Sequence, residues 1–100
     1  MPKGYVLFNV KINDQAAYDA YAAKAVPTIM ASGGNPIIVD DEPEVIEGTW
    51  KPRTVVVEFD SVDAAKNWYH SPEYQAIAGE RHAATDSSAV IAPGFEMPTG

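Results

Sequence analysis

The sequence predicts an α+β fold in which helices cover one face of a single antiparallel sheet. The first observation is the order of patterns along the 100 residues: strand, helix, two short strands, strand, two helices and strand. The second is that two strand patterns alternate between an apolar and a mixed face, as strands covered on one side do. The third is the length, which with 46% hydrophobic residues suits one compact domain.

The first strand and the first helix are predicted from residue 5 onward. In the strand at residues 5–12 one face is apolar (Val6, Phe8, Val10, Ile12) and the other mixed (Tyr5, Leu7, Asn9, Lys11). Asn13 and Asp14 then end the strand and cap a helix. Pro27 lies inside this helix, and because an interior proline costs about 3 kcal/mol we expect a kink or a restart there. Gly33 and Gly34 end the helix.

The middle of the chain predicts a short hairpin. Residues 36–40 form its first strand and residues 44–48 its second, joined by an acidic turn at residues 41–43. Residues 49–52 form a loop around Trp50, which either packs at an edge between two copies or gates a pocket.

The best-specified stretch is residues 53–75. Its strand at residues 53–59 places Val55, Val57 and Phe59 on one face and Thr54, Val56 and Glu58 on the other. Ser61 caps one helix, and Ser71 followed by Pro72 starts a second. A last strand at residues 87–92 completes a single domain at residues 1–92, and residues 93–100 form a tail.

These elements give two β-α-β crossovers around a hairpin, which is the ferredoxin-like arrangement. The apolar strand faces lie under the helices, so the mixed faces are left open, and there Tyr5, Leu7 and Val56 expose apolar surface. A second copy packed sheet to sheet would cover this surface and enclose a partly polar cavity; a solvated open face is the alternative. Because a domain of this size buries only roughly 60–65% of its unfolded surface, pairing would also add stability.

Composition narrows the classes of partner. The formal net charge is −7, which excludes a basic face for nucleic acid. The chain has no cysteine, and therefore neither disulfides nor thiolate sites. It shows neither the apolar core of a signal peptide nor a run of about 20 apolar residues, so we expect a cytoplasmic protein that does not enter the membrane.

Several motifs resemble those of a family of bacterial proteins of about this length that is known as a domain of unknown function. They are Gly4-Tyr5, Gly33-Gly34, Glu47-Gly48-x-Trp50-x-Pro52-Arg53, Val56-Val57-Glu58-Phe59 and the block from Ser61 to Gln75. The last block is the most specific, and the resemblance covers roughly residues 4–92. It implies the ferredoxin-like fold and a homodimer of the dimeric α/β-barrel superfamily, without supplying a reaction.

The wider superfamily includes cofactor-independent monooxygenases, muconolactone-type isomerases and haem-degrading monooxygenases. The haem-degrading group uses an asparagine on the first strand, a tryptophan on the helix after the third strand and a histidine ten residues beyond it. Asn9 and Trp68 are similar to the first two, but Ala78 stands at the third position. The resemblance therefore does not imply a haem site.

The candidate site residues are Glu58, Asn9, Arg53, Trp68 and Tyr5. Glu58 is the candidate general base, with a pKa raised by a half-apolar cavity; the alternative is a structural carboxylate paired with Arg53, Lys11 or the partner copy. Asn9 and Arg53 are candidate polar anchors, although Asn9 would equally satisfy a backbone group. Tyr5 and Trp68 are candidate pocket walls, although aromatic residues at helical spacing are more often core.

The remaining polar residues predict solvated roles. We expect His70 and His82 in water, Arg81 in a surface ion pair and the acidic side chains within residues 40–44 hydrated. No phosphate loop, nucleophile elbow or metal motif occurs, so no cofactor and no metal are expected. Two functions remain open: a cofactor-independent monooxygenase or isomerase acting on a small aromatic or carbonyl metabolite, and a non-catalytic dimer that binds a metabolite or serves as a structural partner.

Overall fold

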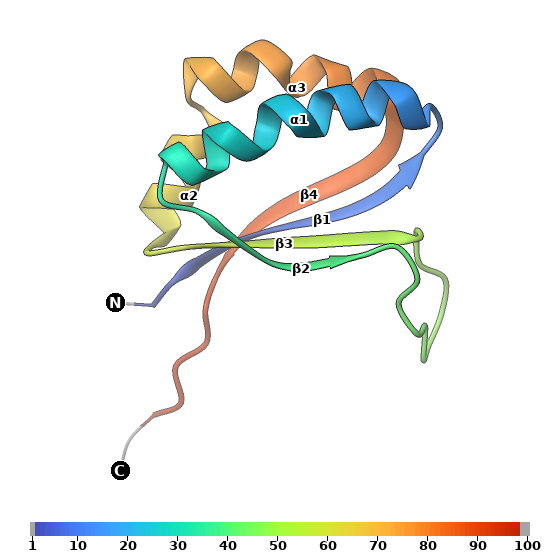
Figure 1. Ribbon diagram of the computed structural model, residues 1–100. Coiled ribbons are helices and arrows are strands. Elements are labelled where there is room, and N and C mark those ends of the chain that lie inside the picture. The colour runs from blue at the N-terminus through green and yellow to red at the C-terminus, as the bar shows by residue number, and fades with distance from the viewer. Residues whose placement is uncertain (1, 99–100) are drawn as a thin grey trace.

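A four-stranded antiparallel sheet with three helices on one face forms the structure, a computed structural model that describes residues 2–98 (Figure 1). The elements are β1 (Gly4–Ile12), α1 (Gln15–Ala31), β2 (Asn35–Asp40), β3 (Arg53–Phe59), α2 (Val62–Tyr69), α3 (Pro72–Ala84) and β4 (Thr85–Pro93). The strand order is β2-β3-β1-β4, with every neighbouring pair antiparallel. This confirms the predicted α+β, ferredoxin-like class.

The core lies between the sheet and the helices. Alternation along β1 buries Val6, Phe8 and Val10, and the same alternation along β3 buries Val57 and Phe59. The helices complete this core with a second set of side chains: Tyr18, Tyr21, Ala25, Ile29, Ala65, Trp68, Tyr74, Ala78 and Ala84. The apolar strand faces therefore lie under the helices, as predicted.

Each helix begins at the residue that the sequence indicates. Asp14, Ser61 and Ser71 each accept a hydrogen bond from the backbone N–H three residues ahead, at 3.1, 3.0 and 3.2 Å respectively. These side chains satisfy N–H groups that have no partner inside the helix. In α3 the cap is followed by Pro72 at the first helical position, where a missing N–H costs nothing.

Of the two outcomes predicted at Pro27, a kink or a restart, the restart is wrong. Helix α1 runs unbroken from Gln15 to Ala31 with Pro27 inside it. The end at Gly33 and Gly34 is confirmed: Gly33 has a φ of 79°, and the Gly34 N–H donates to the carbonyl of Ile29 at 2.9 Å. This is the Schellman arrangement, which needs a residue that tolerates positive φ.

The second strand of the predicted hairpin is wrong. Residues 44–48 lie in a loop at residues 41–52 that projects from the sheet (Figure 1). The strand expected to pair with this segment, β2, pairs instead with β3, so that the whole loop connects β2 to β3. In contrast, β4 is longer than predicted, because it follows α3 directly and pairs with β1 from Thr85 onward.

Candidate functional site

A polar contact on the open face of the sheet joins Tyr5 and Glu58. The two residues are directly opposite each other in the β1–β3 register. The Tyr5 hydroxyl donates to Glu58 Oε2 at 3.0 Å, and Lys3 Nζ donates to Glu58 Oε1 at 3.1 Å. The Glu58 side chain is 25% exposed, so this carboxylate is held by two donors but still meets water.

The two donors, Lys3 and Tyr5, stabilise the ionised form of the Glu58 carboxyl group. The hydrogen bonds from Lys3 and then from Tyr5 hold the pKa of the Glu58 carboxyl below its usual value, because both favour the ionised form. The bond to Glu58 in turn raises the pKa of the Tyr5 hydroxyl. The shift of Glu58 is opposite to the raised pKa expected for a poised base, and its partner is Lys3, not Arg53 or Lys11.

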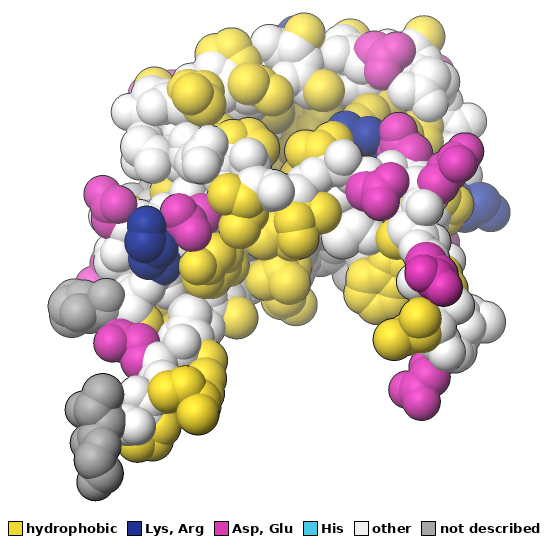
Figure 2. All heavy atoms as spheres, turned by 60° about the horizontal axis from the view of Figure 1, so that its bottom comes forward, with side chains coloured by type: hydrophobic (Ala, Val, Ile, Leu, Met, Phe, Trp, Pro, Cys, Tyr) yellow, Lys and Arg dark blue, Asp and Glu magenta, His cyan; other side chains and the backbone are white. Residues whose placement is uncertain are grey.

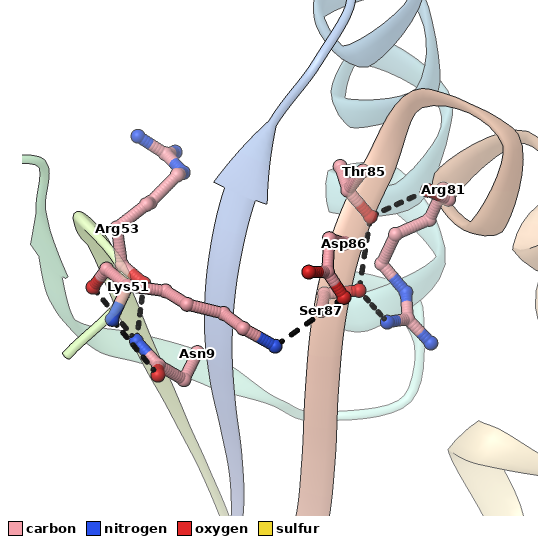
Figure 3. Close-up of polar contacts among 7 residues, drawn as sticks. All are labelled: Asn9, Lys51, Arg53, Arg81, Thr85, Asp86 and Ser87. Carbon is pink, nitrogen blue, oxygen red and sulfur yellow. Dashed lines mark hydrogen bonds and ion pairs between the residues drawn. The ribbon is translucent and has the colours of Figure 1, made fainter. Parts of the chain in front are cut away.

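Asn9 holds the backbone of the loop at residues 41–52. Its Nδ2 donates to the carbonyl of Lys51 at 2.9 Å and to that of Arg53 at 3.3 Å, and its Oδ1 accepts from the Lys51 N–H at 3.3 Å (Figure 3). The structural alternative for Asn9 is therefore observed. Four residues of strand separate Asn9 from Tyr5, roughly 13 Å, so Asn9 and Glu58 do not form one constellation.

A hollow of about 270 Å³ lies on the open face beside Asn9. Leu7, Trp50 and Val90 are among its lining residues. The Trp50 indole is half-exposed, and its Nε1 donates to Thr54 Oγ1 at 2.9 Å. Trp50 thus stands as a wall of this hollow at the base of the loop.

Trp68 is a core residue and does not reach the open face. It is 1% exposed, its ring centroid lies 4.2 Å from that of Tyr74, and its Nε1 donates to Thr28 Oγ1 at 3.0 Å. The prediction that Trp68 walls an open-face pocket beside Glu58 is therefore wrong. Helix α2 covers the opposite side of the sheet, which is why its apolar stripe is buried there.

Arg53 also lies on the helix side. Its parity matches that of Val55 and Val57, so it projects away from Glu58. Arg53 Nε donates to the Tyr18 hydroxyl at 3.1 Å and Nη1 donates to Asp41 Oδ1 at 2.7 Å. Figure 3 shows the side chains of Arg53 and Asn9 pointing apart. The five predicted site residues are thus divided between the two faces, and the hydrogen bond between Tyr5 and Glu58 is the one that joins two of their side chains within residues 2–98.

Sequence reasoning missed the burial of Arg81. Instead of a surface ion pair, Arg81 is 4% exposed and its guanidinium lies 5.1 Å from the ring centre of Phe8. The signal was its spacing, because Tyr74, Ala78 and Arg81 follow one stripe of α3. Arg81 and Arg53 line the same cavity of about 90 Å³ between α1 and the sheet.

Neither a metal-binding cluster nor a membrane-spanning helix is present among residues 2–98. Within residues 2–98 no group of three or more His, Asp or Glu side chains is placed to hold a metal ion. Over the same residues no helix has the length and apolar character that crossing a membrane requires. Both histidines, His70 and His82, are exposed, in agreement with their predicted solvated roles.

Comparison with known proteins identifies the family. Residues 3–95 match the family described as "Domain of unknown function (DUF1330)", so the chain belongs to that family. A search of curated proteins gave no match.

Solved structures share the fold. One is a protein of unknown function from Rhodopseudomonas palustris, with a TM-score of 0.78, 19% identity, and coverage of 96% of this chain and 85% of that one. Another is the cofactor-independent oxygenase SnoaB from Streptomyces nogalater, with a TM-score of 0.64, 11% identity and 97% of both chains covered. A third is a dimeric ferredoxin-like protein of unknown function from Thermobifida fusca, with a TM-score of 0.64, 14% identity, and 92% and 91% covered. At these identities the likeness establishes the fold.

Proposed function

We propose that this protein is a homodimer that acts, without a bound cofactor, on a small aromatic or carbonyl metabolite at the open face of the sheet, with Glu58 as the proton acceptor. The observation that carries the proposal is the Tyr5–Glu58 pair, an ionised carboxylate fixed by two donors beside apolar surface. The fold shared with a protein described as a cofactor-independent oxygenase supports the reaction class.

The homodimer is supported by an apolar row across the open face. The strand register brings Ile38, Val56, Leu7 and Val90 side by side, one from each strand. Ile38, Leu7 and Val90 are exposed, and apolar residues also occupy the middle of the hollowed face in Figure 2. Two segments project beside this face: the loop with Ile46 and Trp50, and the C-terminal segment with Phe95 and Met97.

A second copy on this row would enclose the polar groups on both sides of it. Tyr5 and Glu58 lie on one side of the row, and Asn9 and Thr54 on the other. Excluding water from Glu58 would raise its pKa from the lowered value that Lys3 and Tyr5 impose, and so strengthen it as a base. The dimer would thus supply the dry environment that the single chain lacks.

A carboxylate remains a weak base even when its pKa is raised, and this limits the substrates. A weakly basic carboxylate removes only a proton that is already acidic, such as one on a carbon between two aromatic rings that are conjugated with a carbonyl. In that step Glu58 accepts the proton and the electron pair stays on the substrate carbanion. Transfer of electrons from this carbanion to O₂, addition of oxygen and loss of water would convert an anthrone and O₂ into an anthraquinone and H₂O.

The test is oxygen consumption with anthrone as the substrate. We expect wild-type protein to accelerate the reaction and Glu58→Gln to lose most of the acceleration, by roughly 10²-fold or more for a general base. Glu80→Gln is the matched control, because it removes one carboxylate on α3 that binds Lys24. Equal rates for wild type and Glu58→Gln would remove Glu58 from the mechanism.

A second candidate function is a non-catalytic dimer that binds a metabolite. The lowered pKa of Glu58 and the backbone contacts of Asn9 favour it, since both describe structural polar groups. NMR titration of the Glu58 carboxyl in the dimer separates the two functions. A pKa at or below about 4.3, the value of a free glutamate, favours the non-catalytic dimer.

A further inference from the structure

The buried guanidinium of Arg81 has hydrogen-bond partners but no counter-ion. Nε donates to the Tyr74 hydroxyl at 3.3 Å, Nη1 donates to Ser87 Oγ at 2.8 Å, and Nη2 lies 3.2 Å from His82 Nε2. None of these groups is a carboxylate, and no ion pair of Arg81 occurs among residues 2–98. A charge that is 96% buried is normally paired, because its desolvation is otherwise uncompensated.

The hydroxyl groups of Thr85 and Ser87 form a ring of hydrogen bonds with Arg81 and have no proton left for another acceptor. Ser87 Oγ accepts from Arg81 and lies 2.9 Å from Thr85 Oγ1, and Thr85 Oγ1 donates to the carbonyl of Arg81 at 2.6 Å (Figure 3). Since Thr85 donates its only proton to that carbonyl, Ser87 is the donor in the contact between the two hydroxyls. The ring therefore holds Nη1 of the guanidinium in place but contains no negatively charged group.

On the other side of Arg81 the network has more donors than acceptors. Tyr74 and Tyr21 are joined by a single hydroxyl contact at 2.7 Å, which uses only one of their two protons. A guanidinium carries five N–H groups, and three contacts are formed here. The unused N–H and O–H donors, together with the uncompensated positive charge of Arg81, would be satisfied by an anion that accepts hydrogen bonds.

The cavity that Arg81 lines supplies the space and a second cation. Arg53 lines it as well, and its carboxylate partner Asp41 is an exposed side chain of the projecting loop. Most of the remaining lining is apolar, contributed mainly by α1, β2 and β3. Val26 and Val39 are part of the lining and are also exposed, so the cavity reaches the surface between α1 and β2.

We infer that this cavity binds a small monocarboxylate with an apolar body, the carboxylate between the two arginines and the body against the apolar lining. Arginine presents a planar fork that matches a carboxylate, and a carboxylate has enough lone pairs for the spare N–H and O–H donors. A phosphate would leave much of its charge and hydration against the apolar wall. The site lies on the opposite face of the sheet from Glu58, so the inference is independent of the proposed reaction.

The experiment is calorimetric titration of the full chain with benzoate, with benzamide and with inorganic phosphate. Benzamide has the same shape without the charge. We expect benzoate to bind at least about ten-fold more tightly than benzamide, since hydrogen bonds to a charged group are worth that much. Arg53→Gln should weaken benzoate about ten-fold, whereas Lys66→Gln, an equal change of charge on the exposed face of α2, should leave it unchanged.

Chemical shifts locate the site independently of affinity. Benzoate should move the amide signals of Ala25, Val26 and Val39, and leave those of Leu7 and Val90 in place. Arg81→Lys keeps the charge and loses the fork, and should weaken benzoate; if this variant does not fold, the result with Arg53→Gln decides.

Three outcomes would overturn the inference. They are equal binding of benzoate and benzamide, phosphate binding as tight as benzoate, and shifts confined to the open face. Glu58→Gln should bind benzoate as wild type does, so a failed oxygen assay leaves this site standing and a failed titration leaves the proposed reaction standing.

Discussion

The two faces of the sheet hold their charged groups in opposite ways, although the same strands build both. On the open face Glu58 has Lys3 as a counter-ion and contacts water. On the helix face Arg81 is withdrawn from water and surrounded by neutral donors and acceptors. A paired, hydrated charge is a stable end state, whereas a buried charge without a counter-ion carries an uncompensated desolvation cost that a bound anion would lower. The helix face therefore points to a ligand more strongly than the open face does.

The largest difference expected between the two faces is in stability, and the two tryptophans, one on each face, measure it. Trp68→Ala removes a side chain buried among Phe59 and Tyr74, and should lower the free energy of unfolding by about 3–5 kcal/mol. Trp50→Ala, on the open face, should cost less than about 1 kcal/mol. Urea denaturation of both variants measures the difference. Similar losses would mean that Trp50 is as deeply packed in solution as Trp68.

A subtler test removes one hydroxyl at a time from the helix face. Tyr74→Phe takes the acceptor from Arg81 Nε and should destabilise the fold by about 1–3 kcal/mol, because a buried charged donor loses its partner. Tyr21→Phe takes away a hydroxyl that contacts only Tyr74 and should cost about 0.5–1.5 kcal/mol. Thermal unfolding of both variants gives the order. The reverse order would contradict the donor surplus.

The open face is tested through self-association. Leu7→Thr keeps a residue that strands tolerate but removes an apolar side chain from the centre of the row, once in each copy. The dissociation constant of the proposed dimer should rise about ten-fold or more, since a buried leucine contributes about 1.5–3 kcal/mol. Sedimentation equilibrium measures it. Lys11→Thr, an exposed position of the same strand face, is the control, and an equal effect of both would speak against the row as the interface.

The smallest expected effect is the pH dependence that Glu58 adds to stability. Its pKa is lowered in the folded state, so its contribution is present above the unfolded pKa of about 4.5 and is lost as the pH falls through the folded pKa. The urea midpoints of wild type and Glu58→Gln should therefore differ most near pH 7 and converge below pH 4. A difference that grows on acidification would show that the pKa is raised instead.

Local signals predicted most of the fold. Asp14, Ser61 and Ser71 start helices wherever a short polar side chain can reach the backbone three residues ahead, and that rule needs no tertiary information. The false strand at residues 44–48 shows the limit of such rules. Which segment pairs with β2 depends on the competition between the nearby residues 44–48 and β3, and β3 prevails in the folded sheet.

The candidate site was harder to predict, for a related reason. Parity along β3 already placed Arg53 with Val55 and Val57, and this signal was present in the sequence. The separation of Asn9 from Tyr5 also follows from strand geometry alone. What no local pattern contains is the partner of each charge: Lys3 for Glu58, and neutral side chains for Arg81. Those contacts join residues that the chain brings together only after folding.

The charge balance of the chain also affects how copies of the protein meet at long range. Seven basic residues stand against fourteen acidic residues, which gives a formal charge of −7. Two copies approaching each other therefore repel one another. Salt shortens the reach of that repulsion to about 10 Å at 0.1 M ionic strength. Association through the open face should accordingly be slow in dilute buffer and accelerate with added salt, the reverse of the behaviour of oppositely charged partners.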